Sequence, residues 1–270
     1  MSRTSAVKRH EQVSHDRFRD SYPDSGADRG LLELVPGEAR DSLLAIHDVL
    51  RRELPQGPVA TYEAGGGSSS FLPGDVLSRS HVTVVDIDQD QIRNNVYAQE
   101  AILGDVQTYR FGPDTFDVVI CYNVIEHLPD VEAALLNFRD ALKRGGMILI
   151  GAPNPRSLSG VVTKYSPHWF HVWFYRHIRG IKTAGLPGEA PFPTFFHPLV
   201  TLSRLEAFAA ANGLETIYRR EVESPRYPEM RQRKPLFAAL VDAGAAVLNA
   251  VLPRGTDVRR GDYHVILRKH

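Results

Sequence analysis

The sequence predicts an α/β protein with a doubly wound, Rossmann-like sheet. Two unbroken apolar runs, 116–121 and 147–151, are typical of strands that are buried on both faces of a parallel sheet. A segment with helical periodicity, 131–143, separates them. The same order of strand, glycine-containing turn and helix occurs earlier in the chain, which is the doubly wound pattern.

The other elements follow from periodicity and from turn residues. Apolar residues at helical spacing predict a helix over 38–53, which Pro55 and Gly57 end. Gly213 is expected to end a later helix in the left-handed conformation. Residues 1–30 are polar, and we expect a loosely ordered lead-in. The remaining predicted elements are strands at 59–63, 81–86, 214–222 and 263–268, and helices at 89–100, 202–212 and 235–252.

An aromatic-rich segment interrupts this pattern after residue 151. Nine aromatic residues lie between 165 and 197: Tyr165, Trp169, Phe170, Trp173, Phe174, Tyr175, Phe192, Phe195 and Phe196. We interpret the segment as a lid inserted over the open end of the sheet. The chain then divides into a lead-in with its helix (1–58), a core of alternating strands and helices (59–151), the aromatic lid (152–201) and the C-terminal part of the same α/β domain (202–270).

Composition excludes several classes of protein. The 270 residues carry 32 basic and 32 acidic side chains, and 43% are hydrophobic, which is ordinary for a globular protein and excludes a disordered or collagen-like chain. A net charge of zero argues against a nucleic-acid partner. Cys121 is the only cysteine, so an intramolecular disulfide or a thiolate zinc cluster is excluded.

The longest apolar stretch, 236–252, is too short for a bilayer span and contains Asp242. Since no signal peptide is visible either, we expect a cytoplasmic protein with no integral membrane association. The stretch suits closure of a substrate tunnel, pairing of two subunits in a homodimer, or contact with a membrane surface. Burial against the sheet is the interpretation we favour.

Three acidic residues follow predicted strands in the first half of the sheet. Glu63 ends the first strand and precedes three glycines, which let backbone approach a ligand closely. Asp86 ends the second strand, where a carboxylate can accept hydrogen bonds from ribose hydroxyls. Asp88 suits the cap of the next helix better, which leaves Asp86 for a ligand. Asp105 is either a simple turn residue or an acceptor for an adenine amino group.

Two further motifs come in order along the chain. Residues 122–130, Tyr-Asn-Val-Ile-Glu-His-Leu-Pro-Asp, follow the first apolar strand, and residues 142–146, Leu-Lys-Arg-Gly-Gly, precede the second. With the glycine turn and the two aspartates, they make the chain resemble the class I S-adenosylmethionine-dependent methyltransferases over roughly 59–151. Ser69 departs from the pattern, because it stands at the family's third glycine.

The resemblance implies a seven-stranded sheet with an antiparallel last strand, and the strand at 263–268 fits that place. It also implies S-adenosylmethionine as the cofactor. Glu63 and the glycine backbone would hold its methionine part, Asp86 its ribose and Asp105 its adenine. The residues implied to bind the cofactor are Glu63, Gly65, Gly67, Asp86, Asp105, Tyr122 and Asn123, of which the last two line the junction with the substrate.

The implied reaction moves a methyl group to a small-molecule acceptor, for which we favour a hydroxyl of a sugar or natural product. A hydroxyl nucleophile needs a general base, commonly histidine, and the candidates are His127, His171 and His197. His168, His171 and Tyr175 share one face of a predicted helix. These side chains could act as a base, as a polar gate or as a hydrogen-bonded patch that only stabilises the structure, and we favour the last interpretation. We expect no metal.

Two alternatives remain open at this point. A nicotinamide-dependent dehydrogenase would use Gly65, Gly67 and Asp86, but its third glycine would fall at Ser70. A methyltransferase-like fold that serves only as a binding subunit is the other alternative, and Ser69 motivates it.

Overall fold

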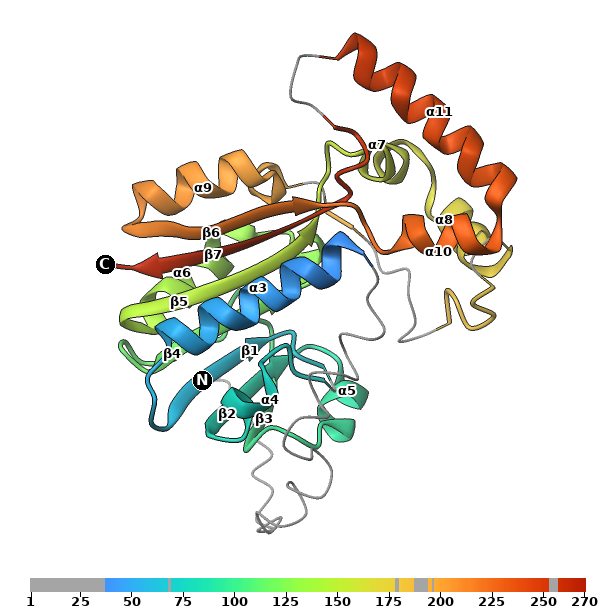
Figure 1. Cartoon of the computed structure of the whole chain (residues 1–270). Coiled ribbons are helices and arrows are strands. Elements are labelled where there is room, and N and C mark those ends of the chain that lie inside the picture. The colour runs from blue at the N-terminus through green and yellow to red at the C-terminus, as the bar shows by residue number, and fades with distance from the viewer. Residues whose placement is uncertain (1–36, 68, 178–179, 187–193, 196, 253–256) are drawn as a thin grey trace.

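The computed structural model describes residues 37–67, 69–177, 180–186, 194–195, 197–252 and 257–270. These residues form a seven-stranded sheet with helices on both faces and a group of helices beyond one end (Figure 1). The predicted lead-in, 1–30, lies outside the described residues, as do Phe192 and Phe196 of the aromatic segment.

The strands are arranged in the order β3-β2-β1-β4-β5-β7-β6. Strand β7 runs antiparallel to both of its neighbours, whereas β1 to β5 are parallel to one another, so the predicted fold class is confirmed. The strands are β1 (Val59–Ala64), β2 (Ser80–Asp86), β3 (Glu100–Leu103), β4 (Phe116–Tyr122), β5 (Leu142–Pro153), β6 (Leu214–Val222) and β7 (Asp262–Lys269). The helices are α3 (Glu38–Glu53), α4 (Gly74–Leu77), α5 (Gln89–Asn94), η1 (Ile125–His127), α6 (Val131–Ala141), α7 (Leu158–Tyr165), α8 (His168–His177), η2 (Pro198–Val200), α9 (Leu202–Ala211), α10 (Arg226–Arg233) and α11 (Pro235–Val251).

The two faces of the sheet have separate cores, which explains the unbroken apolar runs. In β4, Val118 and Ile120 pack in the cluster that holds α3 and α4. Val119 and Cys121 alternate with them and pack in the cluster that holds α6 and α9. Both faces of the central strands are therefore covered, and burial raises the pKa of the Cys121 thiol.

The register brings the ends of the parallel strands to one edge. Ala64 pairs with Val85, and Asp86 pairs with Leu103. Tyr122 pairs with Gly151, at the carboxyl ends of β4 and β5. Because these are all carboxyl ends, the loops that follow β1 to β5 meet at the same edge of the sheet.

One predicted helix is too long. The helix expected over 89–100 ends at Asn94, because the Asn95 side chain accepts hydrogen bonds from the backbone N–H groups of Tyr97 (3.2 Å) and Ala98 (2.9 Å). Glu100 is the first residue of β3 rather than the last of a helix. An asparagine that satisfies the following backbone in this way competes with helix continuation.

The expected burial of 236–252 against the sheet is wrong. Figure 1 shows α11 projecting from the molecule, with α7, α8 and α10 between it and the carboxyl end of β5. Its buried residues are Ala238 and Ala245. We call the group α7, α8, α10 and α11 the helical cap. Helix α10 has no counterpart among the predicted elements.

Candidate active site

Glu63, the next-to-last residue of β1, is fully buried, and two hydroxyl groups hold its carboxylate. Tyr97 Oη donates to Oε2 at 2.9 Å, and Ser70 Oγ donates to Oε1. Burial raises the pKa of Glu63 to about 7, and the two hydrogen bonds partly offset this rise. Glu63 therefore fixes the loop after β1 from its inner side.

The turn after β1 requires glycine at two positions. Gly65 and Gly67 have φ angles of +66° and +55°, in the left-handed region. A Cβ on Gly65 would lie 2.6 Å from Cγ2 of Val124, in the loop after β4. The missing side chain thus lets the two loops approach each other, and it leaves partly exposed backbone at the edge where a ligand would bind.

Asp86 ends β2 with its carboxylate turned toward the glycine loop. Its Oδ2 accepts the Gly67 N–H at 3.1 Å, and its Oδ1 accepts the Asp88 N–H at 2.8 Å. Each oxygen has a second acceptor direction for a ligand hydroxyl. Burial raises the pKa of Asp86, and the two backbone donors act in the opposite direction. Asp88 caps α5, as predicted.

Asp105 lies beyond β3 at the same edge. Its Oδ1 accepts hydrogen bonds from both the backbone N–H and the side-chain Nε2 of Gln107, each at 2.9 Å. The carboxylate therefore closes a turn, which is one of the two interpretations that the sequence left open. It remains partly exposed, so the geometry leaves room for a ligand amino group as well.

Tyr122 and Asn123 form the turn at the end of β4. The Tyr122 ring stacks on Phe71, with 3.9 Å between ring centroids. A Cβ on Gly151 would lie 2.3 Å from this ring, so the neighbouring strand needs a glycine there. Asn123 has a φ of +56°, a conformation that asparagine tolerates better than most residues.

His264 is a residue near this site that the sequence reading did not single out. Its Nε2 lies 2.7 Å from Tyr122 Oη, and its Nδ1 lies 2.7 Å from Ser42 Oγ. Burial lowers the pKa of His264 to about 4, and the charge of Arg220 adds to the effect. The sequence feature that could have indicated His264 is its position as a polar ring within the mostly apolar last strand.

Comparison with known proteins identifies the domain that the first five strands belong to. Residues 62–150, from β1 into β5, match the family model described as a methyltransferase domain. Residues 62–150 are therefore identified as a class I S-adenosylmethionine-dependent methyltransferase domain. The dehydrogenase and the purely binding alternatives are therefore set aside. No curated protein sequence matches the chain significantly.

Several solved structures share the fold of this chain at low sequence identity. A protein described as a sarcosine dimethylglycine methyltransferase of Galdieria sulphuraria is 13% identical, with a TM-score of 0.51 over 91% of this chain and 98% of that one. Phosphoethanolamine N-methyltransferase 2 of Haemonchus contortus, in complex with S-adenosyl-L-methionine, is 18% identical, with a TM-score of 0.50 over 95% of this chain and 60% of that one. The cyclase SpnF is 13% identical, with a TM-score of 0.50 over 83% and 80%. Since a cyclase shares the fold, the fold alone does not fix the acceptor chemistry.

The residues at this edge suit S-adenosylmethionine, the cofactor of the family. Asp86 and Asp105 come from neighbouring strand ends, and their carboxylates match the hydroxyl and amino groups of such a ligand. The buried Glu63 instead holds the glycine loop that would receive the methionine part. Ile87 exposes 77% of its surface directly beside Asp86. This apolar surface suits a flat purine ring, and the sequence reading did not single it out.

The three candidate catalytic histidines lie on different elements. His127 is on η1, directly after the Tyr122–Asn123 turn, with its Nε2 3.8 Å from Glu126 Oε1. His197 caps η2, because its Nδ1 accepts the Leu199 N–H at 3.3 Å. His171 is on α8, and its Nε2 lies 3.2 Å from Ser166 Oγ. Of the three, His127 is the nearest in the chain to the Tyr122–Asn123 turn.

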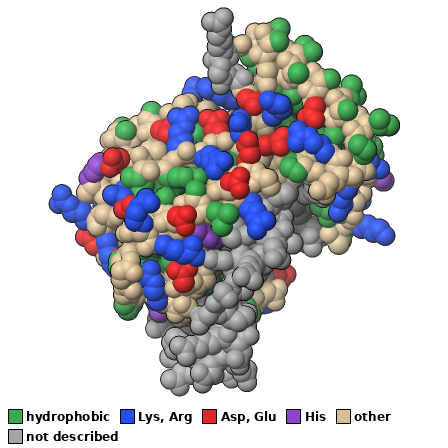
Figure 2. Space-filling view, in the orientation of Figure 1, with side chains coloured by type: hydrophobic (Ala, Val, Ile, Leu, Met, Phe, Trp, Pro, Cys, Tyr) green, Lys and Arg blue, Asp and Glu red, His purple; other side chains and the backbone are tan. Residues whose placement is uncertain are grey.

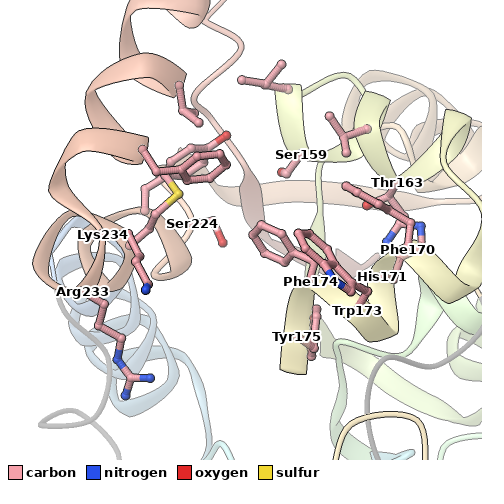
Figure 3. Close-up of a pocket in the computed structure, with 16 residues that line it drawn as sticks. Ser159, Thr163, Phe170, His171, Trp173, Phe174, Tyr175, Ser224, Arg233 and Lys234 are labelled. Carbon is pink, nitrogen blue, oxygen red and sulfur yellow. The ribbon is translucent and has the colours of Figure 1, made fainter. Parts of the chain in front are cut away.

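A cavity of about 550 Å³ lies inside the helical cap. Figure 3 shows Phe170, Trp173 and Phe174 of α8 on one side of it, and Arg233 and Lys234 on the other. The rest of the lining comes from α7, α8, α10, α11 and the segment between β6 and α10: Leu158, Ser159, Val162, Thr163, His171, Tyr175, Ser224, Tyr227, Met230, Phe237 and Val241. The lining is mostly aromatic and aliphatic, and it includes none of the three carboxylates at the strand ends.

Within the described ranges, no three His, Cys, Asp or Glu side chains are placed to hold a metal ion. None of the described helices is both long enough and apolar enough to cross a membrane.

Proposed function

We propose that this methyltransferase transfers a methyl group to a hydroxyl of a small molecule with a largely apolar body. The cavity in the cap is the observation that supports this acceptor. Its volume of about 550 Å³ is in the range of small-molecule sites. A free sugar would need many polar partners to replace water, and this lining supplies few. A natural product with an extended apolar part fits the lining better.

The proposed cofactor site uses the edge at β1 to β4. S-adenosylmethionine, when bound, supplies a methyl group on a sulfonium, which a nucleophile displaces in line. We assign the methionine part to Glu63 and the backbone of Gly65 and Gly67, the ribose to Asp86, the adenine to Asp105, and the junction with the acceptor to Tyr122 and Asn123. The protein contributes mainly by holding both partners in this alignment and by excluding water.

His127 is the best-placed base for a hydroxyl acceptor. Its ring is partly exposed (30%), at the end of β4 where cofactor and acceptor would meet. We propose that Nε2 takes the proton from the acceptor hydroxyl as the oxygen gains the methyl group. Glu126, 3.8 Å away, would stabilise the resulting imidazolium. His171, in the cavity, would position the acceptor body, and His197 would hold the chain that enters α9.

The acceptor is tested with pairs of compounds that share a hydroxyl and differ in polarity, such as 2-naphthol against glucose. S-adenosylhomocysteine release is the readout. Val241→Trp fills the cavity, and Val96→Trp, at a surface position that is 69% exposed, is the matched control. We expect turnover of the apolar compound, its loss in Val241→Trp and unchanged cofactor affinity in both variants. Equal turnover of glucose, or an active Val241→Trp, would contradict the proposed acceptor class.

A further inference from the structure

Helix α11 turns its apolar side outward and its polar side inward. Leu236, Leu240 and Val251 expose 89%, 70% and 76% of their surface. Asp242 and Asn249 lie on the opposite side and bind the rest of the protein. Figure 2 shows the hydrophobic side chains gathered over α11 at the upper right. A surface helix usually has the reverse orientation.

Specific polar contacts fix this orientation. Asp242 Oδ1 accepts from Arg231 Nη2 at 3.0 Å, and the same guanidinium donates to Glu223 Oε1 at 2.8 Å. This guanidinium also holds the pKa of the Asp242 carboxyl below its usual range. Further along, Asn249 donates to Asp257 Oδ1 and accepts the Val258 N–H, each at 2.9 Å. Turning the apolar side inward would break all of these contacts.

The exposed apolar residues form one continuous stripe. Positions 236, 240, 243, 247 and 251 follow the helical repeat along a single face, and all five are Leu, Ala or Val. The 17 residues of α11 give the stripe a length of roughly 25 Å. A contiguous exposed patch of this kind marks an interaction site rather than an ordinary surface.

Basic residues outnumber acidic ones on the exposed surface of the cap, because the acidic groups at α11, Glu223 and Asp242, are ion-paired with Arg231 on its inward side. The sequence contains no Asp or Glu from residue 141 to residue 188. Exposed basic residues are Lys164 on α7, Arg176 on α8, Lys182 after α8, and Arg233 and Lys234 directly before α11. Tyr165 and Trp169, which expose 77% and 69% of their surface, lie among them in the chain. Apolar, basic and amphipathic aromatic residues together are the composition of surfaces that bind anionic bilayers.

The cavity opens beside this surface. Val162, Trp173 and Phe237 all line the cavity, and they expose 45%, 44% and 41% of their surface. Phe237 belongs to α11 itself, one residue after the start of the stripe. Through Phe237, the cavity lining therefore adjoins the start of the stripe.

We propose that the apolar stripe of α11 docks the enzyme on the surface of a lipid bilayer with anionic headgroups. The basic residues of the cap decide between a bilayer and a second copy of the chain, since a two-fold contact through α11 would bring two basic caps together. The docking stands apart from the proposed function, because it requires neither cofactor nor acceptor. If that function is also correct, the acceptor reaches the cavity from the membrane.

The test is co-sedimentation of the full chain with vesicles of phosphatidylcholine alone or mixed with phosphatidylglycerol, without cofactor or acceptor. We expect binding to the mixed vesicles and much weaker binding to phosphatidylcholine alone. Leu240→Ser combined with Val251→Ser should weaken binding by about tenfold or more, because it removes two apolar side chains from the lipid phase. Leu44→Ser combined with Val96→Ser is the matched control, with one leucine and one valine exposed elsewhere (41% and 69%).

Lys164→Gln combined with Lys182→Gln provides a second variant that leaves α11 intact. It should weaken binding to the mixed vesicles only, and added salt should reduce that difference. The oligomeric state of each variant is measured in parallel by sedimentation velocity. Absence of binding to the mixed vesicles would overturn the proposal. An α11 variant that dissociates a dimer but still binds vesicles would also overturn it, and would assign the stripe to a second copy.

Discussion

The hydroxyl of Tyr122 and Nε2 of His264 lie 2.7 Å apart and join the end of β4 to β7 across β5. The other ring nitrogen of His264 lies 2.7 Å from Ser42 Oγ on α3. A neutral imidazole offers one donor and one acceptor, and both are used here. His264 in its neutral form therefore holds in place the tyrosine that borders the proposed methyl-transfer site.

This arrangement predicts a loss of stability in mild acid. Burial lowers the pKa of His264 from 6.5 to about 4, so between these values the unfolded chain binds a proton that the folded chain does not. The stabilisation that comes from keeping His264 neutral is complete above about pH 6.5, and it is lost as the pH falls toward 4. It amounts to about 3 kcal/mol in the free energy of unfolding.

Urea unfolding between pH 7 and pH 4 checks this prediction. His264→Gln should show a shallower pH dependence than the natural chain, by about the amount given above. His81→Gln, at a side chain that is 60% exposed, should leave the dependence unchanged. Parallel curves for His264→Gln and the natural chain would show that His264 does not carry this dependence.

We expect the Glu63 side chain to lower the stability of the protein at high pH, although it contributes to cofactor binding. Because burial raises its folded pKa to about 7, stability is lost as the pH rises from the unfolded value near 4.5 toward 7. Glu63→Gln should therefore raise the melting temperature relative to the natural chain at pH 8 but not at pH 4. Calorimetry should show weaker S-adenosylmethionine binding in the same variant. A variant that is less stable at pH 8, or that binds equally well, would contradict this role.

Asp86→Ala should weaken cofactor binding about ten- to a hundredfold, since charge-assisted hydrogen bonds contribute roughly 1.5–3 kcal/mol. Asp90→Ala removes the same charge nearby at a side chain that is 83% exposed, and it should have little effect. Thermal shift and calorimetry with S-adenosylmethionine and S-adenosylhomocysteine provide the measurement. Equal affinities for the two variants would remove the ribose assignment.

Sequence reasoning succeeds where the signal is local in the chain. The apolar runs identify β4 and β5 because both of their faces are buried, and Asp86 is placed by its position at a strand end. The contact between Tyr122 and His264 joins residues 142 positions apart, and only the order of strands in the sheet brings them together.

The cap shows where such reasoning fails. Helix α10 contains Pro228 and several charged residues, so its sequence lacks the apolar periodicity that predicts a helix. Its Arg231 donates hydrogen bonds to Glu223 and Asp242, which lie outside this helix. Helix α11 is predicted correctly as a helix, but hydropathy favours burial of its apolar side. Its actual orientation depends on polar partners that lie outside the helix.

Measuring cofactor binding and turnover independently distinguishes the roles of the three candidate histidines. His127→Gln should bind cofactor normally and lose most turnover, because general-base catalysis typically contributes about 10²–10⁴-fold. His171→Gln should raise KM for the acceptor more than it lowers kcat. His197→Gln should lower the melting temperature, since it alters the cap of η2. Full turnover in His127→Gln across the pH range would exclude it as the base.

Gly65→Ala should be far more damaging than Gly145→Ala. Both glycines have positive φ, +66° and +79°, so an alanine costs about 1–2 kcal/mol at either position through the backbone alone. A Cβ at Gly145 has no neighbour within 4 Å, whereas at Gly65 it would lie 2.6 Å from Val124. Overpacking adds roughly 1–3 kcal/mol there and pushes the loops after β1 and β4 apart. We therefore expect a lower melting temperature and weaker cofactor binding in Gly65→Ala, and reduced stability alone in Gly145→Ala. Equal effects of the two substitutions on cofactor binding would show that the contact with Val124 does not shape the site.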